Sequence, residues 1–250
     1  MLSDLWHFLP GFLQGLWVTV WVGLASILTM LVTGVALFLL LRTQHRVVGG
    51  AIAFLIEFLR SGSAVVGVFW VFYALPLFIP GAELSGAVSA LIVLGISGGA
   101  YASEILRGAA KGIPVQQLDA CAVLNMGFWT REGRIVLPQV ITSALPSLSA
   151  LSVEVFKWTA VVSLVAVPDF LYWIGVARAQ TGHTAMLYVI AVIVYFLLGR
   201  GVAAGYRLIG RSLGLGVAEP PRRSRGAREA RLARAAMPVN VTAGGGYAHV

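Results

Sequence analysis

Long runs of apolar residues constrain this 250-residue chain more than any other feature. They cover residues 13–41, 64–79, 84–106, 145–167 and 185–205. A helix needs about 20 apolar residues to cross the hydrocarbon core of a bilayer. Four runs reach this length, and the second is expected to reach it by extending backwards through residues 52–59. The sequence therefore predicts an all-α membrane protein with five transmembrane helices.

The composition excludes an ordinary soluble domain. Hydrophobic residues make up 58% of the chain and charged residues 11%, whereas soluble domains carry about 25% charged residues. The single cysteine, Cys121, cannot form an internal disulfide. Residues 1–10 lack the basic start of a signal peptide and contain Asp4, so the first run is expected to remain as a span.

Basic residues are distributed unevenly between the two sets of loops, although the net charge of +8 alone says nothing about their placement. One set contains Arg42, Arg46, Arg107, Lys111, Arg131, Arg134, Arg207, Arg211 and the tail arginines from Arg222 to Arg234. The opposite set contains Arg178. Because Lys and Arg concentrate in cytoplasmic loops, the N-terminus is predicted to lie outside and the C-terminus in the cytoplasm.

Three regions follow from this topology. Residues 1–12 form an extracytoplasmic N-terminus, residues 13–212 a transmembrane domain and residues 213–250 a basic tail. The tail has little apolar surface to bury, so disorder and contact with anionic lipids are expected. The cytoplasmic loop over residues 107–143 mixes charged and apolar residues and has Pro114 and Pro138 as natural helix boundaries, so it is expected to fold.

This loop contains the sequence LDACAVLNMGFWTREGRIVLPQ, which resembles the coupling loop of ATP-binding-cassette (ABC) importer permeases. The family pattern is Glu-Ala-Ala, three residues, Gly, nine residues and Ile-x-Leu-Pro. The corresponding positions here, without a gap, are Asp119, Ala120, Cys121, Asn125, Ile135, Leu137 and Pro138. Asp119 keeps the carboxylate on a shorter stem, and Asn125 is the non-glycine residue type that best tolerates a left-handed turn.

The resemblance implies that this loop couples the chain to an ATPase. No G-x-x-x-x-G-K-[ST] phosphate-binding motif occurs in the chain, so energy must come from a partner. A short helix of small residues at 120–122 can sit closely in a groove of that partner. A rigid Pro138 can then pass its movement to the fourth span. The chain itself is expected to be no enzyme and to bind no cofactor, with ATP and Mg bound by the ATPase.

The similarity covers residues 11–207 and points to the polar amino-acid branch of these permeases. Four segments carry it: GLWVTVWVGLASI, the E-x-x-R of Glu57 and Arg60, GAYASEILRGA, and KWTAVVSLVAVPDF. In that branch, which resides in the bacterial inner membrane, two permease subunits pair as a homodimer or heterodimer. Two cytoplasmic ATPase subunits dock below them, and an extracytoplasmic solute-binding protein delivers the solute. The resemblance implies the same partners here and no nucleic acid.

Departures from the branch fall where the solute path is expected. After Arg60 the branch has Gly-Thr-Pro-Leu and then a glutamine, where this chain has Ser61, Gly62, Ser63, Ala64 and Gly67. After Lys157 the branch has Asp-Thr-Ser, where this chain has Trp158, Thr159 and Ala160. These changes leave a compact zwitterion, such as a compatible solute, as an option beside a polar amino acid.

Charged residues inside the spans are the candidates for solute contact. Glu57 and Arg60, Glu104 and Arg107, and Glu154 and Lys157 are each three residues apart, which places each pair on one helical face. A lone charge near the bilayer centre costs about 2.5 to 3.5 kcal/mol, so pairing or a wet cavity is expected. The predicted path comprises Glu57, Arg60, Ser61, Ser63, Glu104, Glu154, Lys157 and Thr159. The alternative is that the charged pairs only hold helices together.

Two other functions remain as alternatives. A secondary carrier could use Glu57, Glu104 and Glu154 with an ion gradient and no ATPase, although five spans show no obvious inverted repeat. A membrane-embedded enzyme or scaffold lacks any evident nucleophile or cofactor motif, and the four histidines and one cysteine have no metal-ligand spacing. No metal site is therefore expected. The glycines at 95, 98 and 99 should allow close helix packing, and a contact with another subunit is one place for it.

Overall fold

The computed structural model describes residues 6–42, 46–81 and 83–212, and every regular element in these ranges is a helix. The predicted disorder of the basic tail and its contact with lipids fall outside the described residues. Four helices are long and apolar enough to cross a membrane, and one bent pair of helices gives a fifth candidate. The prediction of an all-α membrane protein with five spans is confirmed, whereas its orientation stays a prediction.

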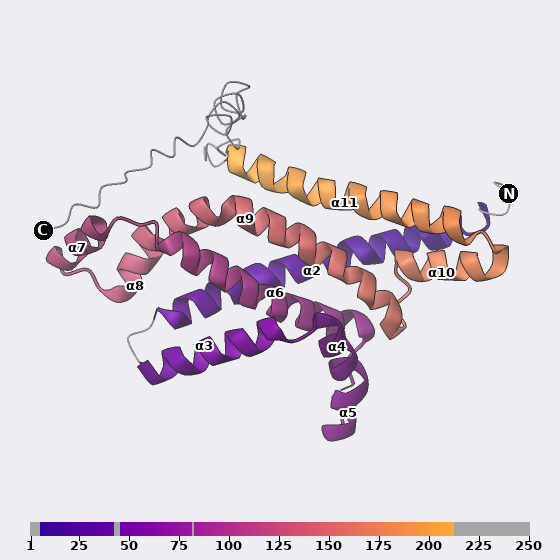
Figure 1. Ribbon diagram of the computed structural model, residues 1–250, viewed down its shortest axis with the longest axis horizontal. Helices are drawn as coiled ribbons and strands as arrows, with labels where there is room; N and C mark the ends of the chain where they lie inside the picture. Colours follow the sequence, from indigo (N-terminus) through magenta and orange to yellow (C-terminus); the bar gives the residue numbers. More distant parts are fainter. Residues whose placement is uncertain (1–5, 43–45, 82, 213–250) are drawn as a thin grey trace, which may run out of the picture. The chain divides into compact units, whose positions relative to one another are not determined.

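Four spans lie where the apolar runs predict them (Figure 1). They are α2 (Leu9–Leu41), α6 (Gly86–Ala110), α9 (Leu137–Trp158), which the 3-10 helix η3 (Thr159–Val165) continues, and α11 (Thr184–Ser212). Helix α9 of the fourth span begins at Leu137 and not at residue 145. Pro138 lies in its first turn, where the backbone N–H that proline lacks is not needed. Pro146 is accommodated inside the same helix.

The second span is not one straight helix, and this corrects the predicted backward extension through residues 52–59. That segment is helical in α3 (Arg46–Ser61), but the chain then turns by 97°. The apolar residues that follow form α4 (Ala64–Phe69), the π-helix η1 (Trp70–Ala74) and α5 (Leu75–Phe78), which run away from α3 in Figure 1.

The residues at this bend explain why the helix stops. Gly62 is a poor helix former, and Ser63 has an extended backbone with φ −77° and ψ 121°. The Ser61 hydroxyl donates to the carbonyl of Phe58, 3.2 Å away, which satisfies a carbonyl at the end of α3. A run of small residues therefore replaces a continuous helix with a bend.

Close packing of α6 against α2 accounts for the glycines of the third span. A β-carbon on Gly95 or Gly99 would lie less than 3.0 Å from the side chain of Thr29 or Thr33 of α2. The Thr33 hydroxyl also lies 3.1 Å from the carbonyl of Gly95 and donates to it. The close approach is as predicted, but the suggested subunit contact at these glycines is wrong, since the neighbour is a helix of the same chain.

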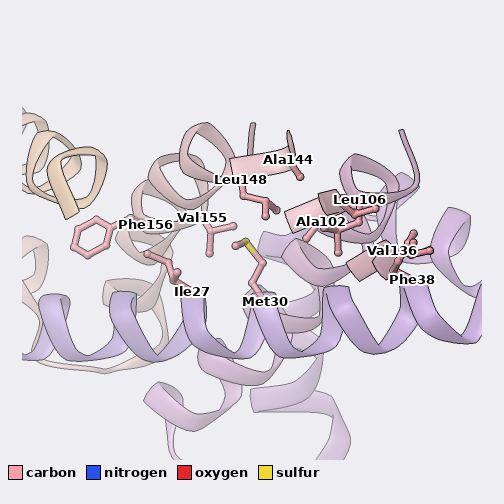
Figure 2. Close-up of a cluster of buried hydrophobic side chains, with 11 residues drawn as sticks. Ile27, Met30, Phe38, Ala102, Leu106, Val136, Ala144, Leu148, Val155 and Phe156 are labelled. Atoms are coloured by element: carbon pink, nitrogen blue, oxygen red, sulfur yellow. The ribbon is translucent and has the colours of Figure 1, made fainter. Parts of the chain in front are cut away.

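A cluster of buried hydrophobic side chains joins α2, α6 and α9 (Figure 2). Its members are Ile27, Met30, Phe38, Ala102, Leu106, Val136, Val140, Ala144, Leu148, Val155 and Phe156. The shorter helix α10 (Phe170–Thr181) packs on α2 and α11. These contacts give the coupling loop and the α3–α4 bend a fixed scaffold.

The loop between α6 and α9 is folded, as predicted. It contains α7 (Val115–Val123), α8 (Phe128–Arg131) and the π-helix η2 (Glu132–Val136). Pro114 is the N-cap of α7, and Pro138 lies in the first turn of α9, so both prolines stand at helix boundaries. The helix expected at residues 120–122 is present and longer. Residues 137–143 of the predicted loop form the first turns of α9.

Candidate functional site

The coupling loop presents α7 as an exposed ledge with one buried anchor. Asp119 and Ala120 are exposed, whereas the Cys121 side chain points inward and is buried. Large apolar side chains at the end of this ledge are also exposed, with Val123 86% and Leu124 74% accessible. Exposed apolar surface of this kind is typical of a docking site for another protein.

Asn125 forms the turn after α7 in the left-handed conformation that the family glycine would allow, with φ 50°. Its backbone N–H donates to the carbonyl of Ala122 at 3.0 Å, and the N–H of Met126 donates to the carbonyl of Cys121 at 3.0 Å. These bonds satisfy carbonyls at the end of α7. The prediction that asparagine preserves this turn is confirmed.

The end of the motif connects the loop to the fourth span. Ile135 and Leu137 are half-buried, and Val136 between them is fully buried in the cluster of Figure 2. Pro138 follows directly in the first turn of α9. Continuous backbone and packed side chains therefore join the loop to α9, although no observation tests the predicted coupling role of these residues.

Sequence analysis missed a buried carboxylate in this loop, that of Glu132, which is 1% exposed. Arg42 at the end of α2 contacts it twice, with Nη2 2.9 Å from Oε1 and Nε 2.7 Å from Oε2. Arg131 of α8 contributes Nη2 at 3.1 Å from Oε1. The local signal was an acidic residue between arginines in the segment REGR, but nothing local indicated Arg42.

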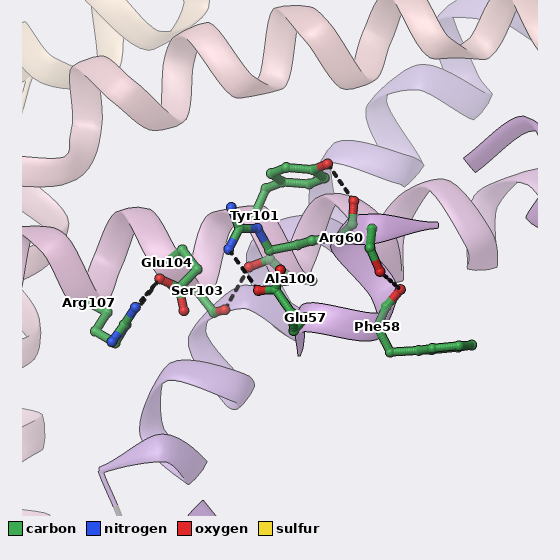
Figure 3. Close-up of polar contacts among 9 residues, drawn as sticks. Glu57, Phe58, Arg60, Ala100, Tyr101, Ser103, Glu104 and Arg107 are labelled. Atoms are coloured by element: carbon green, nitrogen blue, oxygen red, sulfur yellow. Dashed lines mark hydrogen bonds and ion pairs between the residues drawn. The ribbon is translucent and has the colours of Figure 1, made fainter. Parts of the chain in front are cut away.

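The α3–α4 bend lies beside a pocket of about 220 Å³ in the region of the predicted solute path. Ser63, Ser97, Tyr101 and Trp158 contribute to its lining. The Tyr101 hydroxyl donates to the backbone carbonyl of Arg60 at 2.8 Å, and the Arg60 guanidinium lies 5.3 Å from the centre of the Tyr101 ring (Figure 3). The rings of Tyr101 and Trp158 meet edge to face at 6.2 Å.

The predicted i to i+3 ion pairs form on all three helices. The nearest N–O distance is 3.5 Å both for Arg60 with Glu57 and for Lys157 with Glu154. Arg107 is paired with Glu104, as Figure 3 shows for this pair and for Glu57 with Arg60. These pairs differ from the Glu132 contact because each lies within one helix.

The structure gathers only part of the predicted solute path at the pocket. Ser63 lines it, and Arg60 contacts the Tyr101 ring beside it. Glu154 and Lys157 are half exposed and are not among the lining residues, and Thr159 is buried, with its hydroxyl donating to the carbonyl of Phe156 at 2.7 Å. Solute contact by the predicted residues therefore stays a prediction.

A second buried carboxylate that the sequence did not single out is Asp169, which begins α10. Its Oδ1 accepts from the backbone N–H of Tyr172 at 2.8 Å, and the Tyr195 hydroxyl of α11 lies 3.4 Å from Oδ2 and donates to it. Burial raises the pKa of Asp169 from 3.8 to about 6, although these donors lower it in part. The position was recognisable as an N-cap after Pro168, but its burial was not.

Comparisons with known proteins were made for the sequence and for the fold. No family model matches the chain. A probable amino-acid ABC transporter permease of Sinorhizobium fredii is 31% identical over 217 residues, which cover 85% of this chain and 91% of that protein. A permease protein of a glutamine transport system of Escherichia coli K12 is 27% identical over 67% of this chain and 76% of that protein.

The fold is also similar to that of a solved protein. The crystal structure of an amino acid ABC transporter with histidines matches 84% of this chain and 97% of that chain, with a TM-score of 0.74 and 20% sequence identity. At this identity the match concerns the fold alone. Because it covers 84% of this chain, the shared helical arrangement is not confined to the coupling motif.

Proposed function

Because this chain belongs to the family of amino-acid ABC transporter permeases, we propose that it forms half or all of the pore through which an ATP-driven importer moves a polar amino acid or an amino-acid-like zwitterion. The chain is a multi-pass inner-membrane permease subunit. The observation that carries the proposal is the match over 91% of a permease from Sinorhizobium fredii, together with a folded coupling loop at the expected position.

Coupling is assigned to the exposed ledge of α7. Asp119 and Ala120 face outward, so a partner can approach them closely, while the buried Cys121 holds the helix against the rest of the chain. The exposed apolar side chains of Val123 and Leu124 add surface that a partner would bury. We assign ATP and Mg to that cytoplasmic ATPase, and a second permease subunit and a solute-binding protein complete the transporter.

The pocket at the α3–α4 bend supports a small solute. Its volume of about 220 Å³ suits a compact amino-acid-like molecule. The hydroxyls of Ser63 and Ser97 can hydrogen-bond a carboxylate, and the faces of Tyr101 and Trp158 suit a cationic group. Arg60 lies next to the pocket and can attract the carboxylate as it passes. We assign the regions through which the solute enters and leaves this pocket to Glu57, Glu104, Glu154 and Lys157.

The gradient-driven carrier is the weaker alternative, because the relatives named above are a probable amino-acid ABC transporter permease and the permease protein of a glutamine transport system. Uptake that persists after ATP depletion but collapses with the membrane gradient would favour the carrier. Uptake that follows the ATP level supports the proposed importer.

The coupling assignment is tested by replacing Ala120 with tryptophan, which places a large side chain on the exposed ledge. We expect the spans to insert normally while the ATPase no longer copurifies and ATP-dependent uptake is lost by at least about tenfold. The matched control is Lys111→Trp, an exposed position of the same loop outside the motif. Uptake of a panel of labelled polar amino acids and one quaternary-ammonium zwitterion is the measurement, and unchanged uptake by Ala120→Trp contradicts the assignment.

A further inference from the structure

The buried carboxylate of Glu132 connects two parts of the chain that are distant in sequence. It lies in η2, between α8 and α9, and its partner Arg42 is 90 residues away at the end of α2. We propose that Glu132 is a positioning residue that fastens the coupling loop to the end of α2 through Arg42, so that movement of the loop reaches α2 as well as α9. This inference rests on the coupling function proposed above.

The geometry of the contact suits a rigid link. Arg42 Nη2 donates a hydrogen bond to Glu132 Oε1 at 2.9 Å, and Arg42 Nε lies 2.7 Å from Oε2 as a second ionic contact. A hydrogen bond between two ionised groups is stronger than one between neutral groups, so the contact holds η2 close to the end of α2. The Glu132 side chain is 1% exposed, so water does not compete for these contacts.

The link continues into the hydrophobic core on its α2 side. The Arg42 guanidinium lies 5.7 Å from the centre of the Phe38 ring, and Phe38 is fully buried. Phe38 and Val136, four residues after Glu132, belong to the same buried cluster (Figure 2). A displacement of η2 therefore acts on the end of α2 through both an ion pair and packed side chains.

The π-helical geometry of η2 is consistent with a functional constraint at this point. Glu132–Val136 forms a single π-turn between α8 and α9. Such turns are rare and occur often at functional sites, because the wider turn changes the direction of the side chains around it. Here the turn begins with Glu132, whose carboxylate faces Arg42, and it leads directly into α9 at Leu137.

Glu132 has two arginine partners, and they give a matched test. Arg42 joins the carboxylate to another element, whereas Arg131 is its neighbour in sequence and belongs to the same loop. Arg42 and Arg131 are similarly exposed, at 27% and 29% of their side chains. Replacing either one leaves Glu132 with one arginine, so both replacements have a similar electrostatic effect. Only the replacement of Arg42 removes the ion pair with the end of α2.

The experiment compares Arg42→Gln with Arg131→Gln in the full transporter, copurified with its ATPase and binding protein and reconstituted in proteoliposomes. The measured quantity is the number of ATP molecules hydrolysed per molecule of labelled solute taken up, with each polar amino acid of the panel as the probe. We expect Arg42→Gln to raise this ratio at least threefold and Arg131→Gln to leave it within a factor of about 1.5. Equal ratios in the two variants would overturn the proposal.

A second measurement does not depend on transport. Amide hydrogen exchange of the last turn of α2, residues 39–42, is compared in the same two variants in lipid. Arg42→Gln should speed exchange there at least fivefold, whereas Arg131→Gln should not, and unchanged exchange in Arg42→Gln overturns the link. If the unmodified transporter shows no ATP-dependent uptake, the proposed function fails, and the exchange result still decides whether Glu132 holds the loop to α2.

Discussion

Two buried carboxylates, one in the coupling loop and one just before α10, have different kinds of partner. Glu132 in the coupling loop faces the guanidinium groups of Arg42 and Arg131. Asp169, before α10, faces the backbone N–H of Tyr172 and the hydroxyl of Tyr195, which carry no charge. Both side chains are 1% exposed, so the difference lies in their partners and not in their burial.

The partners of each carboxylate determine whether it is sensitive to the loss of a neighbouring residue or to a change of pH. Removing a carboxylate that has cationic neighbours leaves those cations without an anion. Burial disfavours the ionised form of a carboxylate that has only neutral donors, and this effect raises the pKa of Asp169. Glu132 should therefore be sensitive to the loss of a partner, whereas Asp169 should be sensitive to pH.

Replacement of Glu132 with glutamine should give the largest loss of stability. The neutral amide keeps the shape of the side chain but leaves Arg42 and Arg131 without their shared anion. Breaking a buried ion pair from one side costs about 3 to 5 kcal/mol. The measurement is the unfolding free energy of the protein in detergent.

Arg134→Gln is the control for this variant, since it removes a charge from the exposed side of the same π-turn. Its unfolding free energy should change by less than about 0.5 kcal/mol. If the two variants lose equal stability, the buried contact of Glu132 contributes no more to the unfolding free energy than an exposed charge does. The proposed difference between Glu132 and Asp169 would then be wrong.

Asp169 should make stability depend on pH, with a smaller effect. Its pKa is raised from 3.8 to about 6 in the folded chain, so folding favours the protonated form. The stabilisation is complete below pH 3.8 and is lost as the pH rises through 6, which amounts to up to about 3 kcal/mol between these limits. The melting temperature should therefore fall between pH 4 and pH 7.

Asp169→Asn tests this directly, because the amide oxygen can still accept from Tyr172 but no longer titrates. The fall in melting temperature between pH 4 and pH 7 should be much shallower in this variant. A fall as steep as in the unmodified protein would assign the pH dependence to another group.

Features that depend on nearby residues were the ones that sequence could predict. The apolar runs predict the spans, because a bilayer needs a fixed helix length. The resemblance of the loop motif to that of ABC importer permeases implies a short helix at residues 120–122 and a left-handed turn at Asn125, and the structure contains both. Helical periodicity likewise predicts the ion pair of Glu57 with Arg60, three residues apart on one face.

Features that depend on distant residues were missed. Arg42 and Glu132 meet across 90 residues, and the Thr19 hydroxyl accepts from the N–H of Phe170 across 151 residues. No local sequence pattern indicates which distant residue a charged or polar group will face once the spans have packed together. The 97° bend after α3 was missed for a related reason, since hydropathy gives the length of an apolar segment but not its direction.

Loss of an exposed ion pair within a single helix should have the smallest effect on the unfolding free energy. Glu57 is 73% exposed, and its carboxylate lies 3.5 Å from the Arg60 guanidinium. Exposed pairs of this kind contribute about 0.2 to 1 kcal/mol, because water screens them and both side chains lose freedom. Glu57→Gln should therefore change the unfolding free energy by less than about 0.5 kcal/mol. A loss as large as that of Glu132→Gln would contradict the exposed position of this pair and remove the distinction between it and the buried contact.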